Sequence, residues 1–205
     1  MPRTTTAPLT RDSIARAALD LLDERGSAGW TMRALADRLG VRAPSLYSHV
    51  ANQDEILDAV HEQINSEIDL DALEGDDLRT ALTDCARSYR AAYVRHPHAT
   101  ALIAHRPIGT DSALRVYDAI LRTLLRHGVP AGEAMRFTAV LDYLVLGSAV
   151  ETFIGGFGEA ADYREAYPSL AAALQACDRD CIDEEGFELG LARLVEAVVA
   201  ASTER

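Results

Sequence analysis

The apolar residues of this chain recur every three or four positions over nearly its whole length, which is the spacing of one face of an α-helix. No run of alternating β-branched residues bounded by turn residues appears, so the sequence carries no strand pattern. Alanine, leucine, arginine and glutamate dominate, and all four favour helices. We therefore predict an all-α fold.

Glycine and proline divide this helical pattern into segments. Thr10, Thr31 and Asn52 precede three of the segments and are suited to cap helix N-termini, because their side-chain oxygen accepts a hydrogen bond from a free backbone N–H. Gly26 and Gly40 are suited to end helices. The predicted helices cover residues 10–25, 31–39, 44–49, 52–68, 77–95, 99–105, 112–127, 131–153, 168–176 and 185–202. The predicted loops and linkers cover residues 69–77, 155–158 and 178–188.

Length and composition narrow the class of protein. With 205 residues and 48% hydrophobic content, the chain is too apolar to be wholly disordered and long enough for one large domain or two small ones. It has no uninterrupted apolar run of about 18 residues, and residues 1–8 lack the apolar region of a signal peptide. The three cysteines, Cys85, Cys177 and Cys181, are too few for a disulfide framework. We expect a cytoplasmic protein that does not bind membranes.

The charge of the chain is unevenly distributed. Its formal net charge is −12, and all 20 of its cationic residues are arginine. Residues 1–50 hold 7 arginines against 5 acidic residues, whereas residues 51–205 hold 13 arginines against 27. Phosphate binding needs clustered cations, so the total charge argues against nucleic acid. The local balance indicates that any phosphate contact is made by the first fifty residues.

Residues 31–49 (TMRALADRLGVRAPSLYSH) predict two short helices joined by a tight turn at Gly40, which can adopt a positive φ at little cost. The residues placed to form the core between the two helices are Leu35, Leu39, Val41 and Leu46. The residues left exposed are Arg33, Arg42, Ala43, Ser45, Tyr47, Ser48 and His49. They combine guanidinium groups, small side chains and hydroxyl or imidazole donors, as a helix in the DNA major groove requires. An ordinary solvated helical hairpin has the same pattern.

Residues 9–60 resemble the N-terminal DNA-binding domain of the TetR family of bacterial repressors, and especially that of the tetracycline repressor subgroup. The matching segments are LTRDSIARAALDLLDERG, WTMRALADRLGVRAPSLYSHV and NQDEILDAV. The resemblance implies a three-helix helix-turn-helix DNA-binding domain over residues 1–50. It also implies a helical ligand-binding and dimerisation domain over residues 51–205, with a connecting helix at about residues 52–68.

The resemblance also implies which residues contact DNA. Thr31 would cap the second helix and contact phosphate, and Arg33 would reach a base edge, most naturally guanine O6 and N7. The residues that would face bases at the front of the recognition helix are Arg42, Ala43, Pro44 and Ser45. The phosphate anchors would be Tyr47 and His49, with Ser48 on the same surface. Gln53 stands where many relatives have a lysine, so a charged phosphate contact becomes a neutral one. Ala43 replaces a longer polar residue of the tetracycline repressor.

A single recognition helix covers few base pairs, so operator-level affinity requires a dimer on a pseudo-palindrome. Residues 131–153 and 185–202 predict long helices with wide apolar faces, and in the TetR family the corresponding helices of two subunits form a four-helix interface. The candidate interface residues are Val140, Leu144, Gly147, Val150, Leu191, Leu194, Val195, Val198 and Val199. The alternative is that these helices close the core of their own monomer.

Residues 77–154 resemble the tetracycline-repressor-type C-terminal domain through SYRAAYVRHP, the Arg106-Pro107 turn and LVLGSAVE. This resemblance implies a small-molecule inducer that binds among the central helices, tilts the connecting helix and so misplaces the two DNA-reading heads. The candidate ligand contacts are mostly polar or aromatic residues on apolar helices. They are His61, Ile64, Tyr89, Tyr93, Leu102, His105, Arg106, Tyr117, Leu121, Tyr143 and Phe153.

The chain departs from the tetracycline repressors at two histidines that bind the magnesium–drug complex. Their places are taken by Ile68 or Asp69 and by Leu102, so we predict no tetracycline–magnesium binding, no metal site and no cofactor. Cys177 and Cys181 lie four residues apart, but too few soft ligands surround them for a structural zinc site. A redox-sensing pair remains an alternative for these two cysteines.

The sequence shows no nucleophile motif, P-loop or metal-binding helix, so we predict that the protein is not an enzyme. The predicted function is that of a sequence-specific DNA-binding transcriptional regulator, most simply a homodimeric repressor released from a palindromic double-stranded operator by a small molecule. The alternative is a small-molecule binding protein of the same fold with little or no operator binding.

Overall fold

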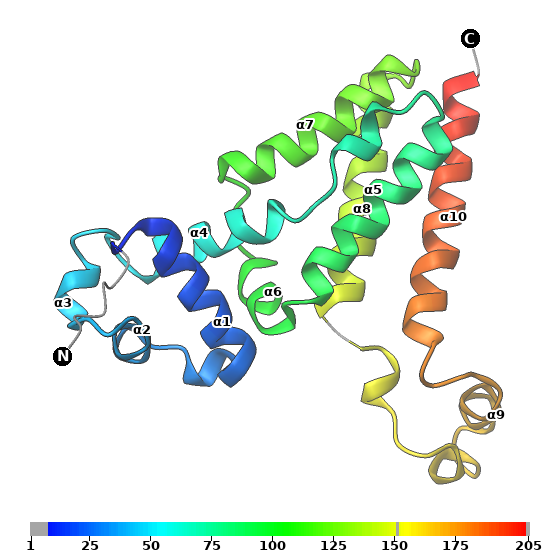
Figure 1. Cartoon of the computed structure of the whole chain (residues 1–205). Helices are drawn as coiled ribbons and strands as arrows, with labels where there is room; N and C mark the ends of the chain where they lie inside the picture. The colour runs from blue at the N-terminus through cyan, green and yellow to red at the C-terminus, as the bar shows by residue number, and fades with distance from the viewer. Residues whose placement is uncertain (1–7, 151, 204–205) are drawn as a thin grey trace. The chain divides into compact units, whose positions relative to one another are not determined.

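The computed structural model describes residues 8–150 and 152–203 (Figure 1). Within these residues the chain forms ten α-helices, three short 3₁₀ helices and no strand, which confirms the predicted all-α class. Residues 1–7 of the predicted DNA-binding domain and Glu151 of the predicted helix 131–153 lie outside the described residues.

The helices group into two compact units. The first unit comprises residues 1–68 and 91–118, and the second comprises residues 69–90 and 119–205. The boundaries fall inside α5 (Leu78–Val94) and α7 (Asp111–Arg126), so each of these helices contributes to both units.

The first four helices of the first unit are α1 (Arg11–Gly29), α2 (Met32–Leu39), α3 (Ala43–Leu46) and α4 (Gln53–Asn65). The three predicted N-caps are confirmed: the side chains of Thr10, Thr31 and Asn52 each accept a hydrogen bond from the backbone N–H three residues further on, at 2.9–3.1 Å. These bonds satisfy donors that the first turn of a helix leaves free.

Both glycines predicted to end helices adopt a positive φ, but only Gly40 ends its helix. Gly40 ends α2 with φ 67°. Gly26 has the same φ of 67° inside α1, so the helix kinks there and continues to Gly29. A side chain at either position would be strained by the left-handed backbone.

The helix predicted over residues 44–49 is shorter in the structure, because α3 ends at Leu46. The carbonyl of Leu46 accepts hydrogen bonds from the backbone N–H groups of both His49 and Val50, at 2.9 and 3.0 Å, and this closes a turn. Tyr47, Ser48 and His49 therefore lie in a turn that follows the recognition helix.

Leu35 and Leu46 are fully buried, as predicted, in the core of the N-terminal helical head (residues 8–50). Leu39 and Val41 were also predicted to lie in this core, but they are only half-buried. An ion pair holds α2 against α1 outside the core, since the guanidinium of Arg38 contacts Glu24 at 2.7 Å and Asp20 at 3.3 Å.

The first unit also contains α6 (Pro97–Ile103), which packs against α1 and α4. Proline at the start of α6 replaces a backbone N–H that a first turn leaves unused. Thr100 is fully buried and donates its hydroxyl hydrogen to the carbonyl of Tyr93 at 2.8 Å, which ties α6 to the end of α5.

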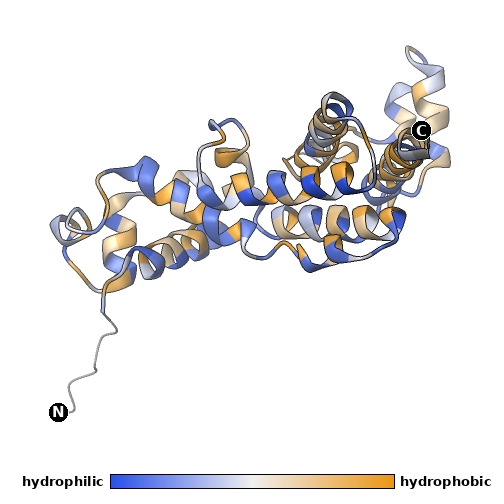
Figure 2. Ribbon diagram, turned by 90° about the horizontal axis from the view of Figure 1, so that it is seen from above, coloured by the Kyte–Doolittle hydropathy of each residue, from blue (hydrophilic) through white to orange (hydrophobic). Residues whose placement is uncertain are grey.

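In the second unit, the C-terminal part of α7 lies with α5, α8 (Ala131–Val150) and α10 (Ile182–Thr203) around an apolar core. Both apolar and polar residues line these helices, as the alternation of orange and blue along the ribbon in Figure 2 shows. Gly190 allows α10 to approach α8 closely, because a Cβ at this position would lie 2.9 Å from Leu144 Cδ1.

Three segments predicted as loops contain helical turns. The segment 69–77 includes η1 (Asp71–Glu74), whose Leu73 is buried, and the linker 155–158 overlaps η2 (Ile154–Gly156). The prediction of a loop over 178–188 was wrong in its second half, because α10 begins at Ile182. Phe187 anchors the start of α10 with 2% exposure. The remaining elements are η3 (Ala160–Tyr163) and α9 (Pro168–Ala176), which pack on each other.

None of the helices in the described part of the chain combines the length and the hydropathy of a membrane-spanning segment.

Candidate nucleic-acid interface and ligand-binding region

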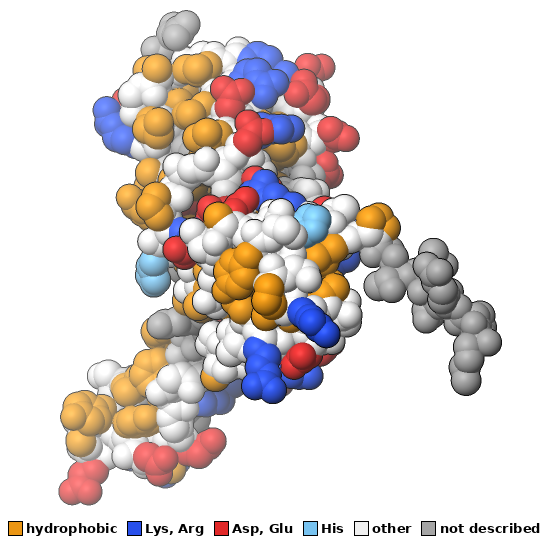
Figure 3. Space-filling view, turned by 90° about the vertical axis from the view of Figure 1, so that its left-hand side faces the viewer, with side chains coloured by type: hydrophobic (Ala, Val, Ile, Leu, Met, Phe, Trp, Pro, Cys, Tyr) orange, Lys and Arg blue, Asp and Glu red, His pale blue; other side chains and the backbone are white. Residues whose placement is uncertain are grey.

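The surface predicted to read DNA is exposed on α2, α3 and the turn that follows them. All of its predicted residues are exposed apart from Ala43, which is half-buried. They are Thr31, Arg33, Arg42, Ala43, Pro44, Ser45, Tyr47, Ser48, His49 and Gln53. Figure 3 looks onto the side of the molecule that lies at the left of Figure 1, where α2 and α3 are found, and arginine side chains are exposed there.

The arginines of the head fall into two groups. Arg11 contacts Glu62 at 3.4 Å and Arg38 contacts Glu24 at 2.7 Å, so acidic neighbours neutralise both. Arg33 and Arg42 are exposed, and neither forms an ion pair with any residue that the structure describes. Two guanidinium groups thus remain available on the α2–α3 surface, and a guanidinium matches the paired acceptors of guanine or phosphate.

The hydroxyl groups of this surface differ in what they can still donate. The Oγ1 of Thr31 accepts from the backbone N–H of Ala34, so its own hydrogen remains for a phosphate oxygen. Ser48 instead donates its hydroxyl hydrogen to the carbonyl of Ser45 at 2.7 Å. Because phosphate oxygens only accept, Ser48 is the less suitable of the two phosphate contacts.

Three of the predicted ligand contacts lie together in the first unit, and two of them belong to a chain of hydrogen bonds. His61 Nε2 lies 2.9 Å from Tyr93 Oη, which donates to Asn65 Oδ1 at 2.8 Å. Asn65 Nδ2 in turn donates to Ser112 Oγ at 3.3 Å. Ile64, the third of these predicted ligand contacts, is fully buried on α4, the helix that also carries His61 and Asn65. The chain connects α4, α5 and α7 through mostly buried polar groups.

Arg106 is engaged with α4 rather than free for a ligand. Its guanidinium contacts Asp54 Oδ1 at 2.7 Å and Asp58 Oδ1 at 2.8 Å. Burial lowers the pKa of Arg106, but its hydrogen bonds with these two carboxylates outweigh burial and raise that pKa. Leu102 on α6 is half-buried and His105 is exposed.

The remaining ligand candidates are scattered. Tyr117 is half-buried on the part of α7 that belongs to the first unit. In the second unit, Tyr89 is buried and donates to Asp142 Oδ1 at 2.8 Å, and Leu121 is half-buried. Tyr143 and Phe153 are 73% and 67% exposed, so they belong to an open groove.

That groove has a volume of about 450 Å³ and lies between the C-terminal half of α8 and the start of α10. Its lining residues are Tyr143, Leu144, Gly147, Ser148, Phe153, Ile182, Asp183, Gly186 and Phe187. The groove is largely apolar at its rim, since two of its aromatic side chains face solvent.

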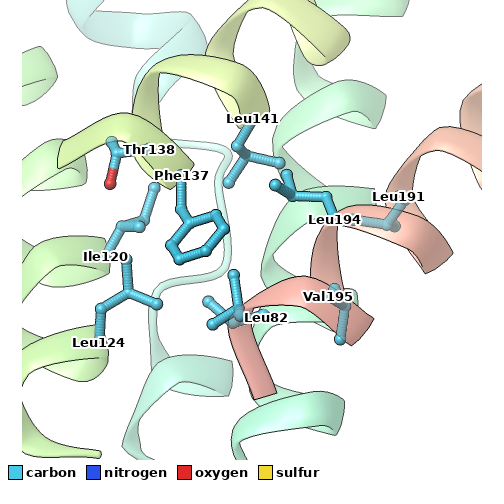
Figure 4. Close-up of a pocket in the computed structure, with 10 residues that line it drawn as sticks. Leu82, Ile120, Leu124, Phe137, Thr138, Leu141, Leu191, Leu194 and Val195 are labelled. Atoms are coloured by element: carbon cyan, nitrogen blue, oxygen red, sulfur yellow. The ribbon is translucent and has the colours of Figure 1, made fainter. Parts of the chain in front are cut away.

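A small apolar cavity of about 20 Å³ lies in the second unit among α5, α7, α8 and α10 (Figure 4). Its lining residues are Leu82, Ile120, Leu124, Phe137, Thr138, Leu141, Leu191, Leu194, Val195 and Val198. Drug-sized ligands need roughly 300–1,000 Å³. The one lining hydroxyl, that of Thr138, already donates to the Ala134 carbonyl at 2.8 Å. The cavity is therefore a packing void in an apolar core.

In the described residues, no group of three or more His, Cys, Asp and Glu side chains is arranged to hold a metal ion. Cys181 is exposed, and the nearby negative charge of Asp178 is the largest of the influences that raise the pKa of its thiol. A raised pKa disfavours the reactive thiolate at Cys181.

Two family models match the chain. Residues 14–60 match the bacterial regulatory proteins of the tetR family, and residues 71–201 match the tetracyclin repressor-like C-terminal domain. The second match alone covers more than half of the 205 residues.

The chain belongs to the TetR family of bacterial regulatory proteins.

Individual relatives agree with this membership. The tetracycline repressor protein class A from transposon 1721 of Escherichia coli is 34% identical over 197 residues, which cover 93% of this chain and 90% of the relative. Apo ActR from Streptomyces coelicolor has a similar structure, with a TM-score of 0.79 at 26% identity over 97% of this chain and 98% of ActR. ActR in complex with actinorhodin gives the same TM-score at 25% identity, over 97% and 100%.

As a TetR-family member, the protein is a ligand-responsive, DNA-binding transcriptional regulator. The helix-turn-helix match at residues 14–60 contains the whole α2–α3 surface described above.

The residues predicted to form the dimer interface lie on α8 and α10. On α8, Val140 is 48% exposed, Gly147 is exposed, and Leu144 and Val150 are half-buried. On α10, the structure supports the alternative of a monomer core for most of the predicted residues. Those that line the small cavity are Leu191, Leu194, Val195 and Val198. Three of these are almost fully buried because α10 packs against three helices of its own chain, whereas Val199 is half-buried.

Proposed function

We propose that this TetR-family protein is a homodimeric transcriptional repressor that binds a pseudo-palindromic operator and is released from it by a small molecule. DNA reading is assigned to residues 1–50, and ligand binding and dimerisation to residues 51–205. The observation that carries the proposal is the pair of exposed arginines, Arg33 and Arg42, which lack acidic partners among the described residues although other arginines of the head have them.

The charge distribution supports one orientation on DNA. Residues 51–205 hold 13 arginines against 27 acidic residues, so that part of the chain is repelled by phosphate. The head carries a small positive excess, and its arginines without an ion pair to a described residue include Arg33 on α2 and Arg42 at the start of α3. The balance of charge thus favours approach through the head.

Within this proposal every residue of the surface except Ser48 has a role. Arg33 binds the edge of a guanine, and Thr31, Tyr47 and His49 bind phosphates. The residues that face bases at the front of α3 are Arg42, Ala43, Pro44 and Ser45. Gln53, at the start of α4, makes a neutral phosphate contact.

We propose that the inducer is a mostly apolar molecule with a few hydrogen-bonding groups, because the predicted ligand contacts combine aliphatic and aromatic side chains with a short polar chain. Its polar group would exchange hydrogen bonds with the His61–Tyr93–Asn65 chain, which links α4 to α5 and α7. Arg106 holds α4 instead, so its part in sensing would be to transmit a shift of α6 to Asp54 and Asp58.

The dimer surface we propose is the exposed face of α8 with its neighbours on α10. Its apolar residues are exposed in the isolated chain, with relative exposures of 48–73% for Met135, Val140, Tyr143 and Leu189. Exposed aromatic and aliphatic residues grouped along a helix are typical of interaction surfaces. Gly147, also exposed, allows a second helix to approach closely.

A second candidate function is supported by the net charge of −12 and by Gln53 and Ala43, which weaken the DNA surface: a small-molecule binding protein with little operator binding. The two functions are separated by selecting duplexes from a random pool with the purified dimer and measuring affinity by fluorescence anisotropy between 50 and 200 mM salt. A repressor selects one pseudo-palindrome, and its affinity falls steeply with salt because counterions are released, with a slope of about −0.9 per phosphate neutralised. No selected sequence, or a flat salt dependence, would establish the second function.

A further inference from the structure

His96 lies at the junction of α5 and α6 and contacts two carboxylates from distant parts of the chain. Its Nδ1 is 2.7 Å from Asp23 Oδ2, and its Nε2 is 3.3 Å from Glu67 Oε1. The side chain is only 16% exposed. An ionised carboxylate accepts hydrogen bonds and cannot donate them, so both contacts are hydrogen bonds when both ring nitrogens carry hydrogen. Each ring nitrogen of His96 thus faces a carboxylate.

The two carboxylates belong to different elements of the first unit. Asp23 lies on α1, one turn before the kink at Gly26, and Glu67 follows the C-terminal end of α4. Arg95, the residue before His96, also contacts Glu67 at 2.7 Å. The next residues add a packing contact, because a Cβ at Gly26 would lie 3.6 Å from the ring of His98. The N-terminal end of α6 is thus attached to α1 and to the end of α4.

The other end of α6 is attached to the start of α4. Arg106, three residues after α6, contacts Asp54 and Asp58 in the first two turns of that helix. Between these two attachments α6 packs on α1 and α4 with its buried residues Ala99, Thr100 and Ile103. Charged groups therefore hold both ends of α6 to α1 and α4. Residues 91–118 share one compact unit with residues 1–68.

We propose that His96 is a positioning residue that fastens α6 to α1, so that the reading head and the α6 segment (residues 91–118) respond to DNA and to ligand as one body. This inference rests on the proposed function. If α6 were attached through α4 alone, a shift of α6 would reach the recognition helix only by bending α4. With His96 in place, α1 carries the shift as well, and α1 is the helix to which Arg38 ties α2.

The coupling must act in both directions, because the free energy that links two sites is reciprocal. DNA bound on α2 and α3 should therefore reduce motion in α6, which makes the inference testable without knowledge of the inducer. The experiment is hydrogen–deuterium exchange of the full-length protein, with and without a duplex that the wild-type protein has selected from a random pool. The variants are His96→Ala, Asp23→Ala and their double substitution. Arg115→Ala serves as the matched control, since it removes an exposed ion pair of the same segment, that of Arg115 with Asp111, which lies within α7 and joins no two elements.

We expect DNA to slow exchange at least threefold both in α2–α3 and in α6 of the wild type and of Arg115→Ala. In His96→Ala, the protection of α2–α3 should persist while that of α6 falls below twofold. Asp23→Ala should lose the same protection, and the double variant should lose no more than His96→Ala, because both substitutions remove the contact between His96 Nδ1 and Asp23.

Two results would overturn the inference. Equal DNA-dependent protection of α6 in His96→Ala and the wild type would show that the packing of α6 on α1 and α4 carries the coupling without His96. If His96→Ala exchanges faster than the wild type in α6 but not in α1 when DNA is absent, His96 acts only as a local cap of α6. If DNA protects neither α2–α3 nor α6 in the wild-type protein, the proposed function itself fails, and this outcome is distinct from the other two. A variant that unfolds is recognised by faster exchange in α8, which belongs to the second unit.

Discussion

Replacement of Arg33 by alanine separates base reading from general attraction to DNA. Arg33 is exposed on α2 and forms no ion pair with a described residue, so its removal should leave the free energy of unfolding within about 0.5 kcal/mol of the wild type. A bidentate arginine–guanine contact contributes about 1–3 kcal/mol of discrimination. The affinity for the selected duplex should therefore fall by roughly 5- to 150-fold for each half-site whose guanine is no longer bound by Arg33.

The assay is fluorescence anisotropy against the selected duplex and against duplexes with one substituted base pair in each half-site. Arg33→Ala should lose its preference at one position per half-site and keep the others. Arg16→Ala is the matched control, because Arg16 is also exposed on the head but pairs with Asp12 at 3.3 Å on α1. It should retain both affinity and preference. An equal reduction of affinity for every duplex with Arg33→Ala would refute the base contact and make Arg33 a phosphate contact.

Four further substitutions or ligands probe the same structure. Tyr47→Phe should weaken binding by a similar factor on all duplexes, because a phosphate contact carries no sequence information; a reduction confined to one sequence in the same anisotropy assay would contradict this role. Val140→Asp should leave a folded monomer in light scattering, since Val140 is 48% exposed in the isolated chain; a stable dimer would place the interface elsewhere. Leu191→Ala should lower the free energy of unfolding by about 2–5 kcal/mol in urea, because Leu191 is 1% exposed and borders a cavity that the substitution enlarges. An effect that appears only on dimer dissociation would contradict a core role. Tetracycline fluorescence with magnesium should not be quenched at micromolar protein, because Leu102 stands where tetracycline repressors have a histidine; quenching would refute this.

Local features of the fold could be predicted from the sequence because their causes are local. Thr10, Thr31 and Asn52 cap helices through bonds that reach only three residues along the chain. Gly40 ends α2 because its own backbone adopts a positive φ. The exposed α2–α3 surface could be predicted in the same way, since its small core residues recur at helical spacing within about fifteen residues.

Features that depend on distant residues could not be predicted. The apolar stripe of α10 is equally compatible with a dimer interface and with a monomer core, and only packing against three other helices shows that Leu191, Val195 and Val198 face inward. Arg106 is conspicuous beside a proline, but its partners Asp54 and Asp58 lie about fifty residues away. His96 contacts Asp23, which lies 73 positions earlier in the chain.

The central claim is that the α2–α3 surface reads DNA as one half of a symmetric pair. A crystal structure of the protein bound to its selected duplex tests this claim most directly. We predict two copies of the chain on one duplex, with the two α3 helices in successive major grooves about 34–36 Å apart and Arg33 within hydrogen-bonding distance of a guanine edge in each half-site. A complex in which the α2–α3 surface faces solvent, or in which a single copy occupies the site, would contradict it.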